Sequence, residues 1–68
     1  MDKQTVARDM KQTFGSSLVC ISQIAKYMGT HTNSMPGFLE GLDYIKYGRY
    51  KKYHVNDVAG RICEKRAV

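Results

Sequence analysis

The spacing of apolar residues changes near Tyr44 from a helical to a strand-like period, and this change limits the folds open to the chain. Before Tyr44, apolar residues recur three and four positions apart, as they do on one face of a helix. From Tyr44 to Val55 they alternate with polar residues, as in a half-buried strand. A helical pattern returns after Val55. The sequence therefore predicts a mainly α fold with one small β-hairpin.

The first two helices are expected at residues 2–14 and at about residues 20–28. Asp2 is a suitable N-cap for the first helix, and a glycine stands where each helix should end. The first apolar face consists of Val6, Met10 and Phe14, and the second of Ile21, Ile24, Ala25 and Met28. Both helices are therefore expected to pack one face on a core.

A third helix is expected at residues 33–42, after a polar run that starts at Thr30. Asn33 and Ser34 can accept hydrogen bonds from the N–H groups that open a helix. Pro36 is tolerated in the first turn. Two glycines inside the segment each cost about 1 kcal/mol relative to alanine. This helix should therefore be short and weak.

The hairpin is expected to span Tyr44 to Val55, with its tip at Gly48 and Arg49. A last helix should follow, capped at its start by Asn56. Its apolar face would consist of Val58, Ala59, Ile62 and Cys63. The predicted order is helix, helix, turn, helix, hairpin, helix.

Most of the excess positive charge lies in the predicted hairpin. Eleven Lys and Arg against six Asp and Glu give the chain a net charge of +5. Residues 44–55 hold no acidic residue and four cations, namely Lys46, Arg49, Lys51 and Lys52. Four of the five tyrosines lie there too. Cations interleaved with aromatic rings suit a polyphosphate partner. The same tyrosines could instead be ordinary strand residues, which is the reading we prefer for Tyr53.

Other features exclude several classes of protein. A chain of 68 residues has room for one small domain without a separate substrate domain. Its longest apolar run is too short to cross a membrane, and its start lacks the apolar core of a signal peptide. Cys20 and Cys63 are expected as core residues. Neither histidine has an evident acidic partner, and no glycine-rich phosphate loop is present. We therefore expect a soluble cytoplasmic protein that has no membrane contact, enzyme activity, metal or other cofactor.

The predicted order of elements is typical of a winged helix-turn-helix with an additional N-terminal helix. Residues 20–28 would be the supporting helix, residues 33–42 the recognition helix in the major groove, and the hairpin the wing. Thr32, Asn33 and Ser34 would then face the base edges, although Asn33 and Ser34 are equally suited to be helix caps.

Three stretches resemble the small winged-helix domains of phage and transposon excisionases and, more distantly, of mercury-resistance-type regulators. These are ISQIAKYMG, THTNSMPGFLEGL and IKYGRYKKYHVNDV. The matching positions are Ala25, Met28 and Gly29 in the supporting helix, Gly48 and Arg49 at the wing tip, and Asn56 and Asp57 at the closing helix. The resemblance covers residues 19–62 of the single domain 1–68, and residues 1–15 form the additional helix.

The chain also departs from the family pattern. Residues 33–42 hold no cation and include Glu40, so strong bidentate reading of guanine is not expected from this helix. Binding should depend on the wing and on DNA shape. Cys20 stands where the family tends to have a capping Ser or Thr, so Ser17 is expected to cap that helix.

The resemblance implies a DNA-binding accessory factor of site-specific recombination. Such a factor binds and bends double-stranded DNA at an attachment site of a phage or mobile element, and it can self-associate cooperatively on the DNA. Its partner would be a site-specific recombinase, an integrase. We assign phosphate contacts to Lys46, Arg49, Lys51 and Lys52, base-edge contacts to Thr32, Asn33 and Ser34, and a further DNA contact to Tyr50.

Two alternatives stay open. A small transcriptional regulator of a phage or mobile element would use the same fold, but it would need a stable dimer, and no heptad pattern provides one. A winged-helix protein that docks on a host protein would instead bind without DNA. The weakly charged recognition helix and the N-terminal helix permit this second alternative.

Overall fold

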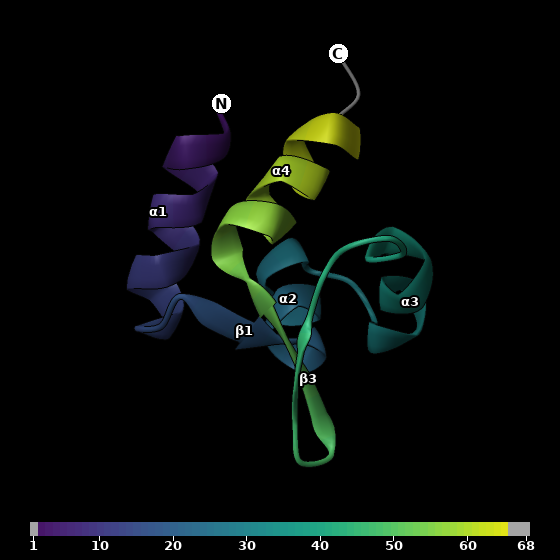
Figure 1. The fold of residues 1–68 in the computed structure, drawn as a ribbon. Coiled ribbons are helices and arrows are strands. Elements are labelled where there is room, and N and C mark those ends of the chain that lie inside the picture. The colour runs from purple at the N-terminus through teal and green to yellow at the C-terminus, as the bar shows by residue number, and fades with distance from the viewer. Residues whose placement is uncertain (1, 66–68) are drawn as a thin grey trace.

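The computed structural model describes residues 2–65, which form four α-helices, a short 3-10 helix and a three-stranded antiparallel sheet (Figure 1). The mainly helical prediction is therefore confirmed. The elements in order are α1 (Lys3–Phe14), β1 (Leu18–Cys20), α2 (Ile21–Met28), η1 (Thr32–Ser34), α3 (Met35–Phe38), β2 (Ile45–Tyr47), β3 (Tyr50–His54) and α4 (Val55–Lys65).

The boundaries of α1 and the end of α2 are confirmed. The Oδ1 atom of Asp2 accepts a hydrogen bond from the backbone N–H of Thr5 at 2.7 Å, which caps α1. Gly15 and Gly29 end the two helices with φ angles of 69° and 70°. This left-handed conformation carries little strain for glycine alone, so both stop signals could be read from the sequence.

The start of α2 differs from the expectation. Cys20 is the N-cap residue, and its backbone N–H donates to the Oε1 atom of Gln23 at 3.0 Å. The predicted cap by Ser17 is wrong, because residues 18–20 are extended and carry Ser17 away from the helix start. The carbonyl of Ser17 instead accepts from the N–H of Val55 at 2.9 Å.

Strand β1 is the element that the sequence did not predict. It pairs with β3, and in this register Val19 lies opposite Tyr53. Both side chains are buried. A three-residue strand has too few positions to show alternation, so only its pairing with a distant segment reveals it.

The third helix is much shorter than predicted. Instead of residues 33–42, η1 covers one 3-10 turn and α3 covers Met35–Phe38. Gly41 adopts a φ of 86°, which no right-handed helix allows. Ser34 occupies the N-cap position of α3 as predicted, but its side chain forms no capping hydrogen bond, and Asn33 lies inside η1. Met35 and Leu39 are nevertheless buried, as the apolar stripe indicated.

The last helix begins two residues early. Val55 was expected in the hairpin and Asn56 as the cap, but Val55 opens α4 and Asn56 lies inside its first turn. The Nδ1 atom of His54 accepts the N–H of Asn56 at 3.1 Å and so satisfies one of the free donors at this end. The strand passes directly into the helix at Val55, whose side chain is buried and whose N–H donates to the carbonyl of Ser17.

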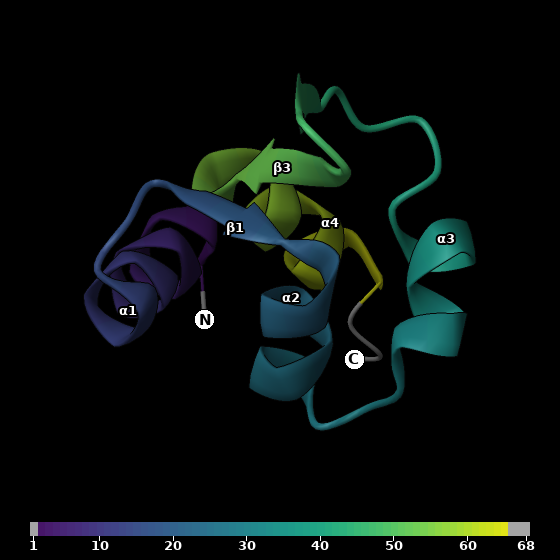
Figure 2. The same cartoon turned by 90° about the horizontal axis from the view of Figure 1, so that it is seen from below.

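One hydrophobic core joins all the helices to the sheet. Helix α1 packs mainly against α4, so it is an integral part of the core. Figure 2 shows the sheet along one side, α2 and α4 beneath it, and α1 and α3 at opposite ends. The predicted inner face of α4 is confirmed, since Val58 and Ala59 are fully buried and Ile62 and Cys63 pack against them.

The two cysteines differ in their packing against the core. Neither Cys20 nor Cys63 forms a disulfide in residues 2–65. Cys63 packs against the core, but Cys20 is only half-buried and is not a core residue. In the same part of the chain, no helix is both long and apolar enough to cross a membrane.

Candidate nucleic-acid interface

The hairpin formed by β2 and β3 projects from the helical body (Figure 1). Its tip lies at Gly48 and Arg49, as predicted. Gly48 has a φ of 62° and Arg49 does not have a positive φ. A positive φ confined to the first central residue is typical of the II′ hairpin turn, which favours glycine there.

The register places like charges opposite each other. Lys46 on β2 is the Cα partner of Lys51 on β3, so both side chains leave the same face of the hairpin. Like charges in such a pair destabilise the sheet. The hairpin therefore holds its cations together at a cost in folding free energy.

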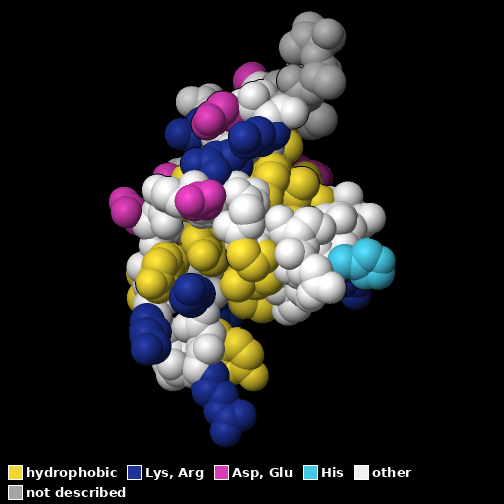
Figure 3. Space-filling view, turned by 90° about the vertical axis from the view of Figure 1, so that its right-hand side faces the viewer, with side chains coloured by type: hydrophobic (Ala, Val, Ile, Leu, Met, Phe, Trp, Pro, Cys, Tyr) yellow, Lys and Arg dark blue, Asp and Glu magenta, His cyan; other side chains and the backbone are white. Residues whose placement is uncertain are grey.

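The hairpin cations are not neutralised by the rest of the described chain. The ion pair found within residues 2–65 joins Arg61 and Glu64 on α4, away from the hairpin. Lys51 forms no ion pair within residues 2–65, and its Nζ atom lies 4.8 Å from the centroid of the Tyr44 ring. Figure 3 shows Lys and Arg side chains along the projecting hairpin, and the acidic side chains visible in that view all lie above it. This surface presents positive charge to solvent.

The four hairpin tyrosines have two different environments. Tyr53 is a buried strand residue, as expected, and the ring of Tyr44 packs on it with centroids 5.8 Å apart. Tyr47 and Tyr50 are 72 % and 62 % exposed. Tyr53 therefore belongs to the core, Tyr44 is 49 % exposed but has a ring partner, and Tyr47 and Tyr50 are the most open to solvent.

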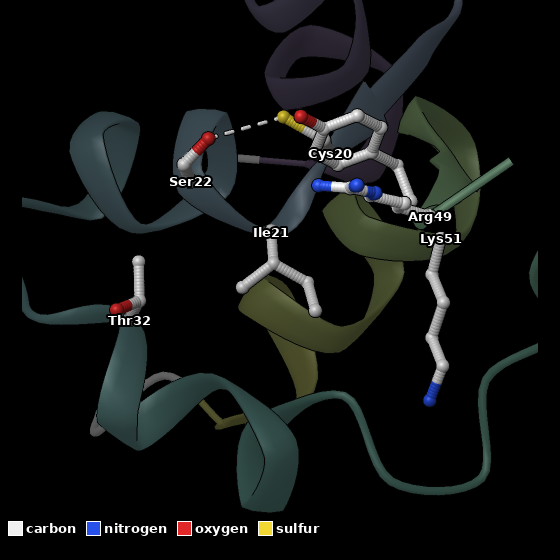
Figure 4. Close-up of a pocket in the computed structure, with 7 residues that line it drawn as sticks. Cys20, Ile21, Ser22, Thr32, Arg49 and Lys51 are labelled. Carbon is white, nitrogen blue, oxygen red and sulfur yellow. Dashed lines mark hydrogen bonds between the residues drawn. The ribbon is translucent and has the colours of Figure 1, made fainter. Parts of the chain in front are cut away.

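A groove of about 360 Å³ lies between the hairpin and the helix pair (Figure 4). Arg49, Tyr50 and Lys51 line it on the hairpin side. Cys20, Ile21 and Ser22 line it at the start of α2, and Thr32 lines it from η1. In Figure 4, Ile21 lies between Thr32 and the two cations, and the Lys51 side chain extends away from Cys20 and Ser22. The apolar side chain of Ile21 thus separates the hydroxyl group of Thr32 from the cations Arg49 and Lys51.

The thiol of Cys20 faces a polar environment at the rim of this groove. Its Sγ atom lies 3.2 Å from the Oγ atom of Ser22. Burial raises the pKa of the Cys20 thiol, but hydrogen bonds with Ser22 and Gln23 and the charge of Lys52 outweigh it and lower the pKa below the ordinary value. The thiolate is therefore easier to form here than in a free cysteine.

The three residues predicted to face base edges are all exposed, but they differ in their freedom to bind a ligand. Thr32 lines the groove. The Ser34 hydroxyl donates to the carbonyl of His31 at 3.1 Å and lies 3.3 Å from the hydroxyl of Thr30. The Asn33 side chain forms no hydrogen bond within residues 2–65. Ser34 therefore has a role in holding the turn, whereas Thr32 and Asn33 present free polar groups.

The structure thus brings together half of the predicted site residues. Thr32, Arg49, Tyr50 and Lys51 share the groove, whereas Asn33, Ser34, Lys46 and Lys52 lie outside its lining. The sequence prediction missed Cys20, Ile21 and Ser22. A signal for Ser22 was present, because it is a hydroxyl residue on the polar side of a helix's first turn.

Among residues 2–65, no three His, Cys, Asp or Glu side chains come close enough together to hold a metal ion. Both histidines are exposed, and His54 accepts the N–H of Asn56 as described above. No protein family, curated protein or solved structure matches the chain.

Proposed function

We propose that this protein binds double-stranded DNA as a winged helix-turn-helix. The arrangement that supports the fold assignment is α2, a polar turn and α3, followed by the hairpin of β2 and β3 and closed by α4. In this interpretation α2 is the supporting helix and the hairpin is the wing. The segment formed by η1 and α3 approaches the major groove. Helix α1 completes the core on the side of α4.

The observation that carries the proposal is the cross-strand pair of Lys46 and Lys51. Two like charges held opposite each other, with no acidic residue from Tyr44 to Asn56, cost stability in the free protein. A polyanion removes that cost, because its phosphates neutralise both charges at once. Arg49 and Lys52 add two further cations to the same projecting hairpin.

The groove has side chains suited to both the phosphates and the base edges of a DNA duplex. Arg49 and Lys51 can reach phosphates, while the hydroxyl of Thr32 can hydrogen-bond to a base edge and its methyl group can contact a thymine methyl. Helix α3 has a single turn without a cation, so it offers little direct reading of sequence. DNA shape and phosphate contacts therefore provide most of the binding energy.

Such a binding mode suits an architectural protein, and with the excisionase resemblance it supports a role as an accessory factor of site-specific recombination. In that role the protein binds and bends DNA at an attachment site of a phage or mobile element, in the cytoplasm, together with an integrase. A stringent operator reader would need more base contacts than α3 provides.

An electrophoretic mobility shift experiment with duplex DNA tests the proposal. The wild type is expected to shift a duplex, and Lys51→Ala is expected to weaken binding several-fold by removing a phosphate contact. Lys26→Ala is the matched control, because Lys26 is an exposed cation near the end of α2 opposite to the groove. Equal losses from the two variants, or no shift by the wild type, would refute the proposed interface.

A further inference from the structure

The hairpin exposes two tyrosine rings on one face. Tyr47 and Tyr50 flank the two-residue turn and are Cα partners, so both side chains leave the same side of the hairpin. Within the described chain, neither ring contacts another ring or forms a hydrogen bond. Large apolar groups exposed together on a small protein generally mark a binding surface.

The other two hairpin tyrosines differ in having ring contacts within the protein. Tyr44 is 49 % exposed, but its ring has the Lys51 ammonium group 4.8 Å from its centroid and packs on the buried Tyr53. These two rings have partners within the protein. Tyr47 and Tyr50 are the two most exposed of the hairpin tyrosines, and neither has a ring or cation–π partner within residues 2–65.

The charge around the two rings favours an anionic occupant. Arg49 lies in the turn between them, and Lys52 leaves the same face as Tyr50 because it is two residues further along β3. No acidic residue is present from Tyr44 to Asn56; Asp43 and Asp57, just outside this range, line a pocket with Lys52 at the base of the hairpin, away from Arg49. A hydrophobic protein surface would leave these cations unpaired and desolvated, whereas a phosphate backbone would neutralise them.

We infer that this face of the hairpin binds an unpaired strand of nucleic acid, with bases stacked on Tyr47 and Tyr50 and phosphates at Arg49 and Lys52. A duplex cannot use these rings in the same way, because its base faces are already stacked on each other and only their edges are accessible. Unpaired bases have free faces that stack on tyrosine. This activity goes beyond the proposed duplex binding and does not require it.

The test uses the full chain with a tryptophan placed at the site. The protein contains no tryptophan, so Tyr47→Trp introduces a single tryptophan, which reports on this position and preserves the ability to stack. An oligothymidylate of about ten nucleotides should bind and quench this fluorescence. The same oligothymidylate, now carrying a fluorescent label, allows the wild type and Tyr47→Leu to be compared by fluorescence anisotropy. Tyr47→Leu should bind it about tenfold more weakly than the wild type, because one stacked base is lost.

Three comparisons make the result decisive. An oligouridylate of the same length reports whether DNA or RNA is preferred, and binding of either supports the inference. Duplex binding by Tyr47→Leu should equal that of the wild type, so a loss of strand binding alone is distinguishable from failure of the proposed duplex function.

Lack of binding to both oligonucleotides, or equal strand binding by wild type and Tyr47→Leu, would overturn the inference. Sedimentation showing that Tyr47 mediates self-association would overturn it too.

Discussion

Arg61 of α4 holds the end of α3 through the carbonyl oxygen of Phe38. Its Nη1 atom donates to that oxygen at 2.8 Å and to the carbonyl of Glu40 at 2.9 Å. The side chain is only 16 % exposed, and its Nε atom has no hydrogen-bond partner within residues 2–65. Helix α3 is a single turn with a glycine and a proline, so a tertiary contact must compensate for its weak intrinsic stability.

Arg61→Met should therefore destabilise the fold by about 2 kcal/mol, because two carbonyl groups lose a charged donor. Urea unfolding followed by circular dichroism measures the change. Amide exchange of Leu39, whose N–H donates to Met35, should accelerate in the same variant. Lys65→Met, at an exposed position of the same helix, should change stability by less than about 0.5 kcal/mol. Equal effects of the two substitutions would show that Arg61 does not support α3.

Two glycines of the third helical segment should respond to alanine in opposite directions. Gly37 is in α3 with open space where a Cβ would lie, so Gly37→Ala should stabilise the protein by about 0.5–1 kcal/mol. Gly41 has a φ of 86°, so Gly41→Ala should destabilise it by about 1–2 kcal/mol. Thermal unfolding of both variants checks this. Stabilisation by both would mean that the helix can extend to residue 42 after all.

The salt dependence of duplex binding should reveal the number of phosphate contacts. If the four hairpin cations each neutralise one phosphate, the slope of log K against log salt is about −3 to −4. Lys51→Ala should reduce its magnitude by about 1. Fluorescence anisotropy at several salt concentrations gives the slopes. A binding constant that is independent of salt would be incompatible with this mechanism.

A bulky group on Cys20 should block duplex binding, because this residue lines the groove beside Arg49 and Tyr50. The lowered pKa of the thiol favours its modification by a maleimide. Modified wild-type protein is expected to lose most of its affinity, and Cys20→Ser treated in the same way should retain it. Mass spectrometry confirms which cysteine carries the label. Full affinity of the modified wild type would place the DNA elsewhere.

Tyr27 should make the free energy of unfolding depend on pH in alkaline solution. Its hydroxyl donates to the carboxylate of Asp9. Burial, that hydrogen bond and the Asp9 charge raise the pKa of Tyr27 to about 12. An unfolded tyrosine ionises near pH 10, so the unfolded chain loses this proton first and the stabilisation disappears between about pH 10 and about pH 12.

Tyr27→Phe should accordingly lower the free energy of unfolding by about 1 kcal/mol near neutral pH. The difference from the wild type should shrink as the pH rises through that window. Chemical unfolding at about pH 8 and about pH 11 measures both values. A difference that stays constant with pH would contradict the assigned hydrogen bond. Tyrosinate absorbance should also show one of the five tyrosines titrating late.

Much of the secondary structure could be predicted because its signals are local. Asp2, Gly15 and Gly29 act through their own backbone geometry, so the limits of α1 and the end of α2 follow from residue type. The hairpin tip at Gly48 is determined in the same way. The concentration of cations in residues 44–55 is also a property of the sequence alone.

The tertiary structure decided the features that depend on distant partners. Strand β1 exists because Val19 pairs with Tyr53, and the start of α4 is set by the bond between Val55 and Ser17. The groove exists because packing brings Ser22 and Thr32 beside Arg49. Each of these contacts joins residues well separated along the chain. Local propensity and periodicity contain no information about such contacts, because their free energy comes from burial and pairing in the folded chain.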